Sequence, residues 1–273
     1  MSFSIVKRDG TREGLDIEKL HKVVEYACDN LTGVSVSEVE LKSHIQFYDK
    51  MTTKEIQETV IKAAADLISE ESPNYQFVAG RLICYDLRKE VFNKFEPPRL
   101  YKHVKRIIKK GFYEEELVNW YTEDEFDTMD TWIDHTRDET MTYAAMEQMR
   151  GKYLVKNRFD KKIYETPQIA FMLIAATLFH KYTDKRMMMV KDFYDCLSRF
   201  DISLPTPVMA GVRTSVRQFS SCVLIETDDS LDSISATSAA IVRYVSKRAG
   251  IGIGAGRIRA LGSPINGGHA THT

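Results

Sequence analysis

A strand–helix–strand pattern near the C-terminal end constrains the fold of this chain more than any other feature. Residues 219–225 form a short, mostly apolar run, residues 230–245 suit a helix that begins after Asp228 or Asp229, and residues 250–254 alternate glycine with isoleucine. Such a crossover predicts two parallel strands in one sheet. A parallel sheet needs cover on both faces and several further strands. We therefore expect residues 206–273 to be the incomplete start of a larger α/β domain, which another polypeptide completes.

The glycine-rich run from Gly250 to Gly256 partly matches a dinucleotide-binding fingerprint, with Ala255 in its last position. That fingerprint follows a strand and opens a helix. Here a helix precedes the run, and residues 257–259, which we predict to form another strand, follow it. We interpret the alternating glycines as a strand that a ligand or a neighbouring strand approaches closely.

The first 95 residues are predicted to form a separate module, a small hairpin on a four-helix cluster. Asp9-Gly10 between extended flanks is a strong hairpin signal. The signals for the starts of the four helices are Asp16, Ser35 with Glu38, Thr52 with Glu55, and Ser72-Pro73.

Four polar residues of this module, Lys7, Lys19, Thr53 and Lys89, could together bind a polyphosphate. Ammonium groups and a helix N-terminus are what a triphosphate requires. Taken from composition alone, the simpler interpretation of ordinary solvated surface residues is favoured.

Residues 96–205 are predicted to form a mainly helical domain. It is expected to contain a second hairpin between residues 152 and 165, an apolar helix that begins at Pro167, and a helix over residues 185–200. The prolines of the loop at residues 203–207 fix its backbone. Thr206 could present its hydroxyl from that loop, although local backbone bonding is the simpler explanation.

Composition excludes several classes of function. With 38 basic and 39 acidic residues the net charge is −1, which gives no support to nucleic-acid binding. No apolar run has the length needed to cross a bilayer, and the N-terminus lacks a signal peptide. The four cysteines form no CxxC pair, and His269 and His272 alone make a weak metal site. We expect a cytoplasmic protein without a metal.

Taken together, several motifs resemble the large, catalytic subunit of class I ribonucleotide reductase, in its bacterial form. They are ELKSHIQFY at 40–48, FEPP at 95–98, GKYL at 151–154, SLPTP at 203–207, SSCVL at 220–224 and RAGIGI at 248–253. The resemblance implies an α+β chain: an ATP cone over 1–95, a helical domain over 96–205, and from 206 the incomplete start of a ten-stranded α/β barrel. It further suggests the N-terminal piece of a split subunit from a large bacteriophage, which would place the protein in the host cytoplasm.

The resemblance also assigns roles to particular residues, and for the lysines of the first module it outweighs the surface interpretation. Cys222 matches one thiol of the redox pair that reduces the ribose. Thr206, Ser221, Ala249 and Gly250 match positions that hold the substrate. The ATP-binding activity site matches Lys7, Glu13, Gly14, Leu15, Asp16, Ile17, Glu18, Lys19, Thr53 and Lys89. The specificity site for deoxynucleotides matches Asp229, Ser230, Leu231, Arg259 and Asn266.

Two positions depart from the family pattern. Asn266 stands where an arginine is expected, and Gln57 stands where bacterial relatives often have histidine. Binding of the specificity effector and inhibition by dATP are the properties that these changes affect.

In the family, a thiyl radical removes the 3′ hydrogen of a ribonucleoside diphosphate, the 2′ hydroxyl leaves as water, and a dithiol supplies the electrons. The implied partners are the rest of the large subunit, a small subunit with a di-iron tyrosyl radical, and thioredoxin or glutaredoxin. ATP, dATP and deoxynucleotides are the implied effectors. The alternatives are a stand-alone nucleotide sensor built on an ATP cone, although such regulators resemble a zinc ribbon joined to the cone, and a truncation without a partner.

Overall fold

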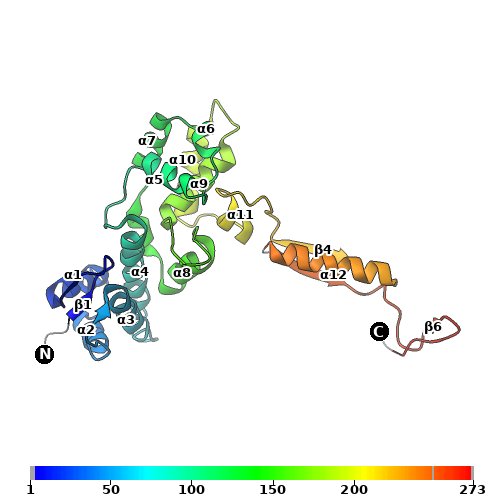
Figure 1. The fold of residues 1–273 in the computed structure, drawn as a ribbon, viewed down its shortest axis with the longest axis horizontal. Coiled ribbons are helices and arrows are strands. Elements are labelled where there is room, and N and C mark those ends of the chain that lie inside the picture. The colour runs from blue at the N-terminus through cyan, green and yellow to red at the C-terminus, as the bar shows by residue number, and fades with distance from the viewer. Residues whose placement is uncertain (1–3, 248, 272–273) are drawn as a thin grey trace. The chain divides into compact units, whose positions relative to one another are not determined.

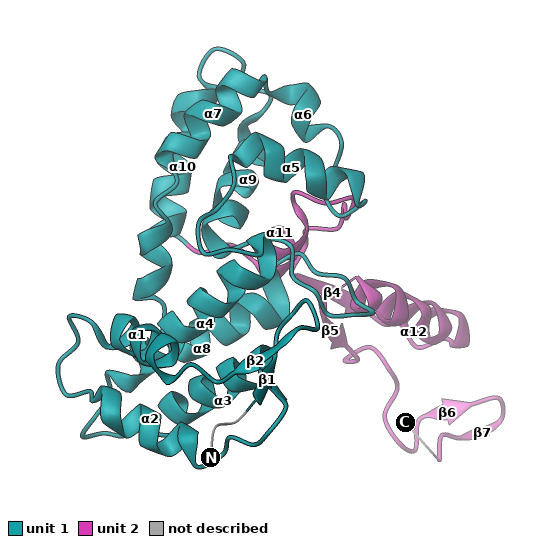
Figure 2. Ribbon diagram, turned by 60° about the vertical axis from the view of Figure 1, so that its left-hand side comes forward, with its two compact units in different colours: residues 1–202 teal, residues 203–273 magenta. Residues whose placement is uncertain are grey.

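The computed structural model describes residues 4–247 and 249–271. The chain divides into two compact units, residues 1–202 and 203–273 (Figures 1 and 2). Arg248 and His272 of the sequence motifs lie outside the described residues.

The first unit begins with a three-stranded sheet and four helices (Figure 1). Strand β1 (Ser4–Val6) pairs antiparallel with β2 (Arg12–Gly14), which confirms the hairpin. The predicted turn glycine Gly10 has a φ of 85°, a value that favours glycine. The two-residue strand β3 (Met51–Thr52) pairs parallel with β1 and was not predicted. The helices are α1 (Ile17–Cys28), α2 (Val36–His44), α3 (Thr53–Ala65) and α4 (Tyr75–Phe92).

The helix caps follow the sequence signals in part. Thr52 and Glu55 make the complete capping box before α3. Ser35 caps α2, but Glu38 does not return the bond, because its carboxylate accepts a hydrogen bond from the hydroxyl of Tyr75. The prediction that Ser72-Pro73 opens the long helix is wrong by two residues. Instead α4 begins at Tyr75, and residues 73–74 form a turn before it.

The rest of the first unit is helical. Its elements are α5 (Leu100–Lys109), α6 (Leu117–Trp120), α7 (Glu123–Trp132), the 3-10 helix η1 (His135–Thr140), α8 (Tyr143–Gln148), the π-helix η2 (Met149–Tyr153), α9 (Pro167–Phe179) and α10 (Arg186–Ser198). Helix α9 begins at the predicted proline and is buried along most of its length. The predicted second hairpin reduces to one antiparallel bridge between Lys156 and Ile163.

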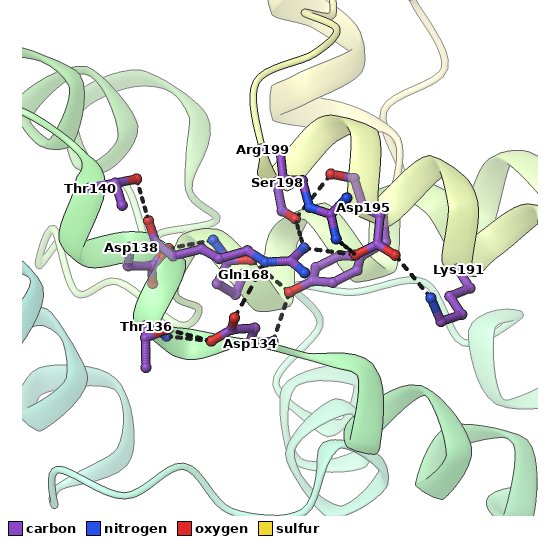
Figure 3. Close-up of polar contacts among 11 residues, drawn as sticks. Asp134, Thr136, Asp138, Thr140, Gln168, Lys191, Asp195, Ser198 and Arg199 are labelled. Atoms are coloured by element: carbon purple, nitrogen blue, oxygen red, sulfur yellow. Dashed lines mark hydrogen bonds and ion pairs between the residues drawn. The ribbon is translucent and has the colours of Figure 1, made fainter.

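Polar side chains link η1 to α9 and α10 inside this helical body (Figure 3). Gln168 donates from Nε2 to Oδ1 of Asp138 at 2.8 Å, and its own Oε1 accepts from the hydroxyl of Tyr194 at 2.7 Å. Asp138 is 1% exposed. Burial raises its pKa to about 7, and the charge of Glu139 acts in the same direction. The hydrogen bond from Gln168 and the charge of Arg88 act in the opposite direction, but burial outweighs them.

Asp138→Asn is expected to remove a pH dependence of folding. The unfolded carboxyl loses its proton near its ordinary pKa, whereas the folded one keeps it up to about pH 7. Folding of the wild type therefore loses about 1.4 kcal/mol for each pH unit between those values. Asparagine still accepts the bond from Gln168 and does not titrate.

Urea unfolding at pH 4 and pH 8 checks this expectation. The free energy of unfolding of Asp138→Asn, measured relative to the wild type, should be higher at pH 8 than at pH 4. An equal difference at both pH values would contradict it. Because the nearby His135 remains in both proteins, its titration cancels in this comparison to first order.

The second unit contains the predicted parallel crossover. Its elements are α11 (Thr206–Gly211), β4 (Cys222–Glu226), α12 (Leu231–Ser246), β5 (Gly250–Gly254), β6 (Pro264–Ile265) and β7 (Gly268–His269). Strands β4 and β5 are parallel, with Cys222 opposite Gly250. A Cβ atom at Gly252 would lie 2.7 Å from Cδ2 of Leu224, so the alternate glycines do make room for the neighbouring strand. Leu224 is 86% exposed, which leaves this face of the strand pair uncovered.

Two predictions for the second unit are wrong. Residues 257–259 do not form a strand, since the chain turns after β5 and the amide of Ile258 donates to the carbonyl of Ala255. The final segment is not only a loop, because β6 and β7 form a hairpin. Its central residues Asn266 and Gly267 have φ values of 44° and 78°, which a two-residue hairpin turn of the Asn-Gly type requires. Among the described residues, no helix is long and apolar enough to cross a membrane.

Candidate functional site

The sheet and helices of the first module enclose two adjoining hollows of about 550 and 660 Å³. Both hollows are lined by Lys7, Thr53, Gln57 and Lys89. Three of these four residues were predicted from the sequence. They come from the segment after β1, the start of α3 and the last turn of α4, so the fold brings together residues that are distant in the sequence.

Cations in the hollows are partly balanced by acids. The ammonium of Lys7 lies 2.5 Å from Oε2 of Glu13, and this contact raises the pKa of the lysine. Lys19 lies 3.3 Å from Oδ2 of Asp16. Lys89 places its ammonium 4.3 Å from the ring centroid of Tyr85, in a cation–π contact. An incoming polyphosphate would therefore find ammonium groups whose carboxylate partners can be exchanged for phosphate oxygens.

The N-terminal ends of two helices face the same region. Thr53 is the first residue of α3, and Asp16 caps α1 by accepting from the amide of Lys19 at 3.2 Å. The free amides of a helix N-terminus favour an anion. Leu15 also lines the larger hollow, whereas the predicted residues Gly14, Ile17 and Glu18 do not line either one.

Sequence reasoning missed two groups of lining residues. Tyr26, Tyr85 and Phe95 form an aromatic wall, with centroids of Tyr85 and Phe95 5.3 Å apart. Such rings suit a nucleobase. The second group is a pair in the smaller hollow, where Arg8 contacts Oδ1 of Asp86 at 2.6 Å. Burial raises the pKa of Asp86, and Arg8 opposes that change. Tyr26 and Tyr85 are visible in the sequence as aromatic residues of predicted helices, but aromatic residues at such positions are equally typical of a packed core.

In the second unit, four predicted residues gather at the N-terminal ends of β4 and β5. Cys222 is exposed and pairs with Gly250, whose amide donates to the carbonyl of Ser221 at 2.7 Å. Ala249 precedes Gly250 and is buried. Thr206 is the first residue of α11, and its place in a substrate site stays a prediction.

The other thiols differ from Cys222 in their surroundings. Cys28 and Cys84 are buried, and burial raises the pKa of Cys28 to about 11 and the pKa of Cys84 as well. Such thiols are poor nucleophiles. Cys196 is half-buried on α10.

The opposite ends of the same strands carry the predicted specificity residues. Arg259 contacts Oδ2 of Asp229 at 2.6 Å, and Ser230 caps α12 by accepting from the amide of Ser233. Leu231 is 84% exposed. Asn266 lies in the turn between β6 and β7, where asparagine adopts positive φ more readily than arginine does. The positive φ of this turn therefore explains why asparagine occupies a position where an arginine is expected.

Comparison with known proteins divides the chain into three matched segments. Residues 3–90 match the ATP cone domain, residues 139–217 the all-alpha domain of ribonucleotide reductase, and residues 220–273 its barrel domain. The chain is 58% identical over 273 residues to the ribonucleoside-diphosphate reductase subunit alpha of Haemophilus influenzae. It is 58% identical over 270 residues to subunit alpha of reductase 1 from Escherichia coli, and 46% identical over 273 residues to subunit alpha from Enterobacteria phage T4.

These alignments cover 98–100% of this chain but 36% of each of the three relatives. The matched part is the N-terminal part of the relatives. The two-stranded parallel sheet therefore corresponds to the start of the barrel, and the strands of the described residues do not close one.

Proposed function

Because the chain carries the ATP cone, the all-alpha domain and the start of the barrel of a class I ribonucleotide reductase large subunit, we propose that it serves as the nucleotide-regulated N-terminal part of such an enzyme. The observation that carries the proposal is the convergence of Lys7, Lys19 and Lys89 around the N-terminal end of α3, beside an aromatic wall. That hollow offers charge for phosphates and rings for a base. ATP and dATP are the ligands that we assign to it.

The reaction that we propose for the completed enzyme is reduction of a ribonucleoside diphosphate. The 2′ hydroxyl leaves as water, a hydrogen replaces it, and two thiols become a disulfide. Cys222 supplies one of these thiols, and the remainder of the barrel supplies the other together with the radical cysteine. Ser221, Ala249, Gly250 and Thr206 hold the substrate. The uncovered face of β4 supports this assignment, because a completed barrel would enclose it.

Asp229, Ser230, Leu231 and Arg259 are proposed to bind the specificity deoxynucleotide at the other ends of the strands. There the dipole of α12 favours an anion, while the contact between Asp229 and Arg259 can be exchanged for a contact with phosphate. Asn266 replaces the expected arginine, so we propose that Arg259 contributes the larger share of cationic charge there.

The partners that we propose are the rest of the large subunit and a radical-generating small subunit with its di-iron tyrosyl radical. Thioredoxin or glutaredoxin would return the disulfide to thiols. A reducing compartment such as the cytoplasm suits this cycle. A stand-alone sensor is disfavoured, because the segments beyond the cone match the all-alpha and barrel domains.

Lys89→Ala is expected to weaken ATP binding by about tenfold or more, since hydrogen bonds to charged groups contribute about 1.5–3 kcal/mol each. Calorimetric titration of the chain with ATP measures the effect. Lys62→Ala is the matched control, because Lys62 is exposed on α3 and is absent from the residues that line the hollows. If Lys89→Ala and Lys62→Ala bind ATP equally well, Lys89 is not part of the ATP site.

A further inference from the structure

The 3-10 helix η1 contacts the wall of the nucleotide hollow on one side. Tyr26, which lines the hollow, donates its hydroxyl hydrogen bond to Oε1 of Glu139 near the end of η1. Arg81 on α4 strengthens this connection by donating to the carbonyls of Glu139 at 3.3 Å and Asp29 at 2.6 Å. The end of η1 is thus tied to the end of α1 and to α4.

On its other side, η1 contacts the helical body (Figure 3). Arg137 contacts Oδ1 of Asp195 at 2.8 Å and also the hydroxyl of Ser198, both on α10. Asp138 accepts from Gln168 on α9. The amide of Asp134, the residue before η1, donates to the hydroxyl of Tyr194 at 2.9 Å. One six-residue helix therefore connects the hollow to both long helices of the body.

Two features of η1 itself favour a change of conformation. A 3-10 helix has poorer hydrogen-bond geometry than an α-helix, and runs as long as six residues are uncommon. In addition, Oδ2 of Asp138 is buried and has no hydrogen-bond partner among the described residues. A buried carboxyl group with only one of its two oxygens hydrogen-bonded stabilises the present position of η1 less than a fully hydrogen-bonded group would.

The segment after η1 packs closely against α4. A Cβ atom at Gly80 would overlap the carbonyl oxygen of Met141, so the backbones touch there without an intervening side chain. The chain that follows η1 is therefore fixed closely against α4.

From this arrangement we propose that η1 couples nucleotide occupancy of the hollow to the positions of α9 and α10, with Tyr26 and Glu139 as the contact that senses the ligand. The proposal rests on the function proposed above for the hollow. Tyr26 acts as a positioning residue: a base that packs against its ring changes the place of its hydroxyl, and the bond to Glu139 passes the change to η1. Coupling of this kind is reciprocal.

The test separates binding from transmission by using Tyr26→Phe, which keeps the ring and removes the hydroxyl. Calorimetry with ATP measures binding, and amide hydrogen exchange with and without ATP measures the response of residues 134–140 and 190–199. In the wild type we expect ATP to change exchange in both segments. In Tyr26→Phe we expect ATP still to bind, because the ring that faces the hollow remains, and the exchange response of both segments to be lost.

Two further variants serve as controls. Tyr48→Phe removes another tyrosine hydroxyl that donates to a glutamate, Glu55, but Tyr48 is absent from the residues that line the hollows, and the response should remain. Glu139→Gln keeps an oxygen acceptor for Tyr26 and should retain the response, whereas Glu139→Ala should lose it. A full response in Tyr26→Phe, or a wild type that binds ATP without any response in η1 and α10, would overturn the coupling. Absence of ATP binding by the wild type would instead overturn the function of the hollow.

Discussion

Cys222→Ser is expected to reduce deoxynucleotide formation to background when the chain is assayed with the rest of the barrel and the small subunit. A serine hydroxyl cannot form the disulfide that supplies two electrons to the ribose. The position of the residue supports this expectation, since Cys222 is exposed at the end of β4 and lies opposite a glycine of β5. Product formation is measured by chromatography of the nucleotides after a fixed time.

Cys196→Ser provides the control for a general effect of losing a thiol. Cys196 is half-buried on α10, and its variant should retain the wild-type rate. ATP binding by Cys222→Ser should also be unchanged, because the hollow lies in the first module. Substantial product from Cys222→Ser would exclude this cysteine from the redox pair.

Local sequence signals predicted much of the fold. Asp9-Gly10, the capping box of Thr52 and Glu55, and Pro167 each fix a turn or a helix start through contacts within a few residues, and the structure has all three. The parallel crossover was also predictable, because its strands and helix differ in length and apolar pattern.

Two of the failures arise because distant partners decide the local structure. Glu38 bonds to Tyr75 rather than completing a capping box, and no pattern within α2 reveals that choice. Strand β3 has only two residues, and it is a strand because it pairs with β1, which lies far away in the sequence. The hairpin around Asn266-Gly267 is different, since its turn signal was in the sequence and was not used.

For the candidate site, the charged residues were easier to nominate than the aromatic ones. From composition alone the lysines suit ordinary surface positions, and the resemblance to the family was what identified them as candidate ligands for phosphate. Tyr26 and Tyr85 occupy helix positions that suit a packed core equally well, so only the fold shows that they line a hollow. The link from Tyr26 to Glu139 joins residues 113 positions apart and could not be predicted from sequence spacing.

The central claim is that this chain supplies one thiol of a redox pair and the rest of the barrel supplies the other. If the remainder of the barrel is provided as a separate polypeptide, turnover without a reductant should join the two polypeptides covalently. A disulfide requires Cα atoms about 4.4–6.8 Å apart with well-oriented Cβ atoms. The bond would therefore also show that the two polypeptides rebuild the barrel with the correct geometry.

A non-reducing gel after one round of substrate turnover tests this claim most directly. We predict a cross-linked species that forms only with substrate and the small subunit, that dithiothreitol dissociates, and that is absent from Cys222→Ser. Variants of Cys28, Cys84 and Cys196 should still form it. A cross-link that persists without Cys222, or product formation by the wild type without any cross-link, would contradict the account.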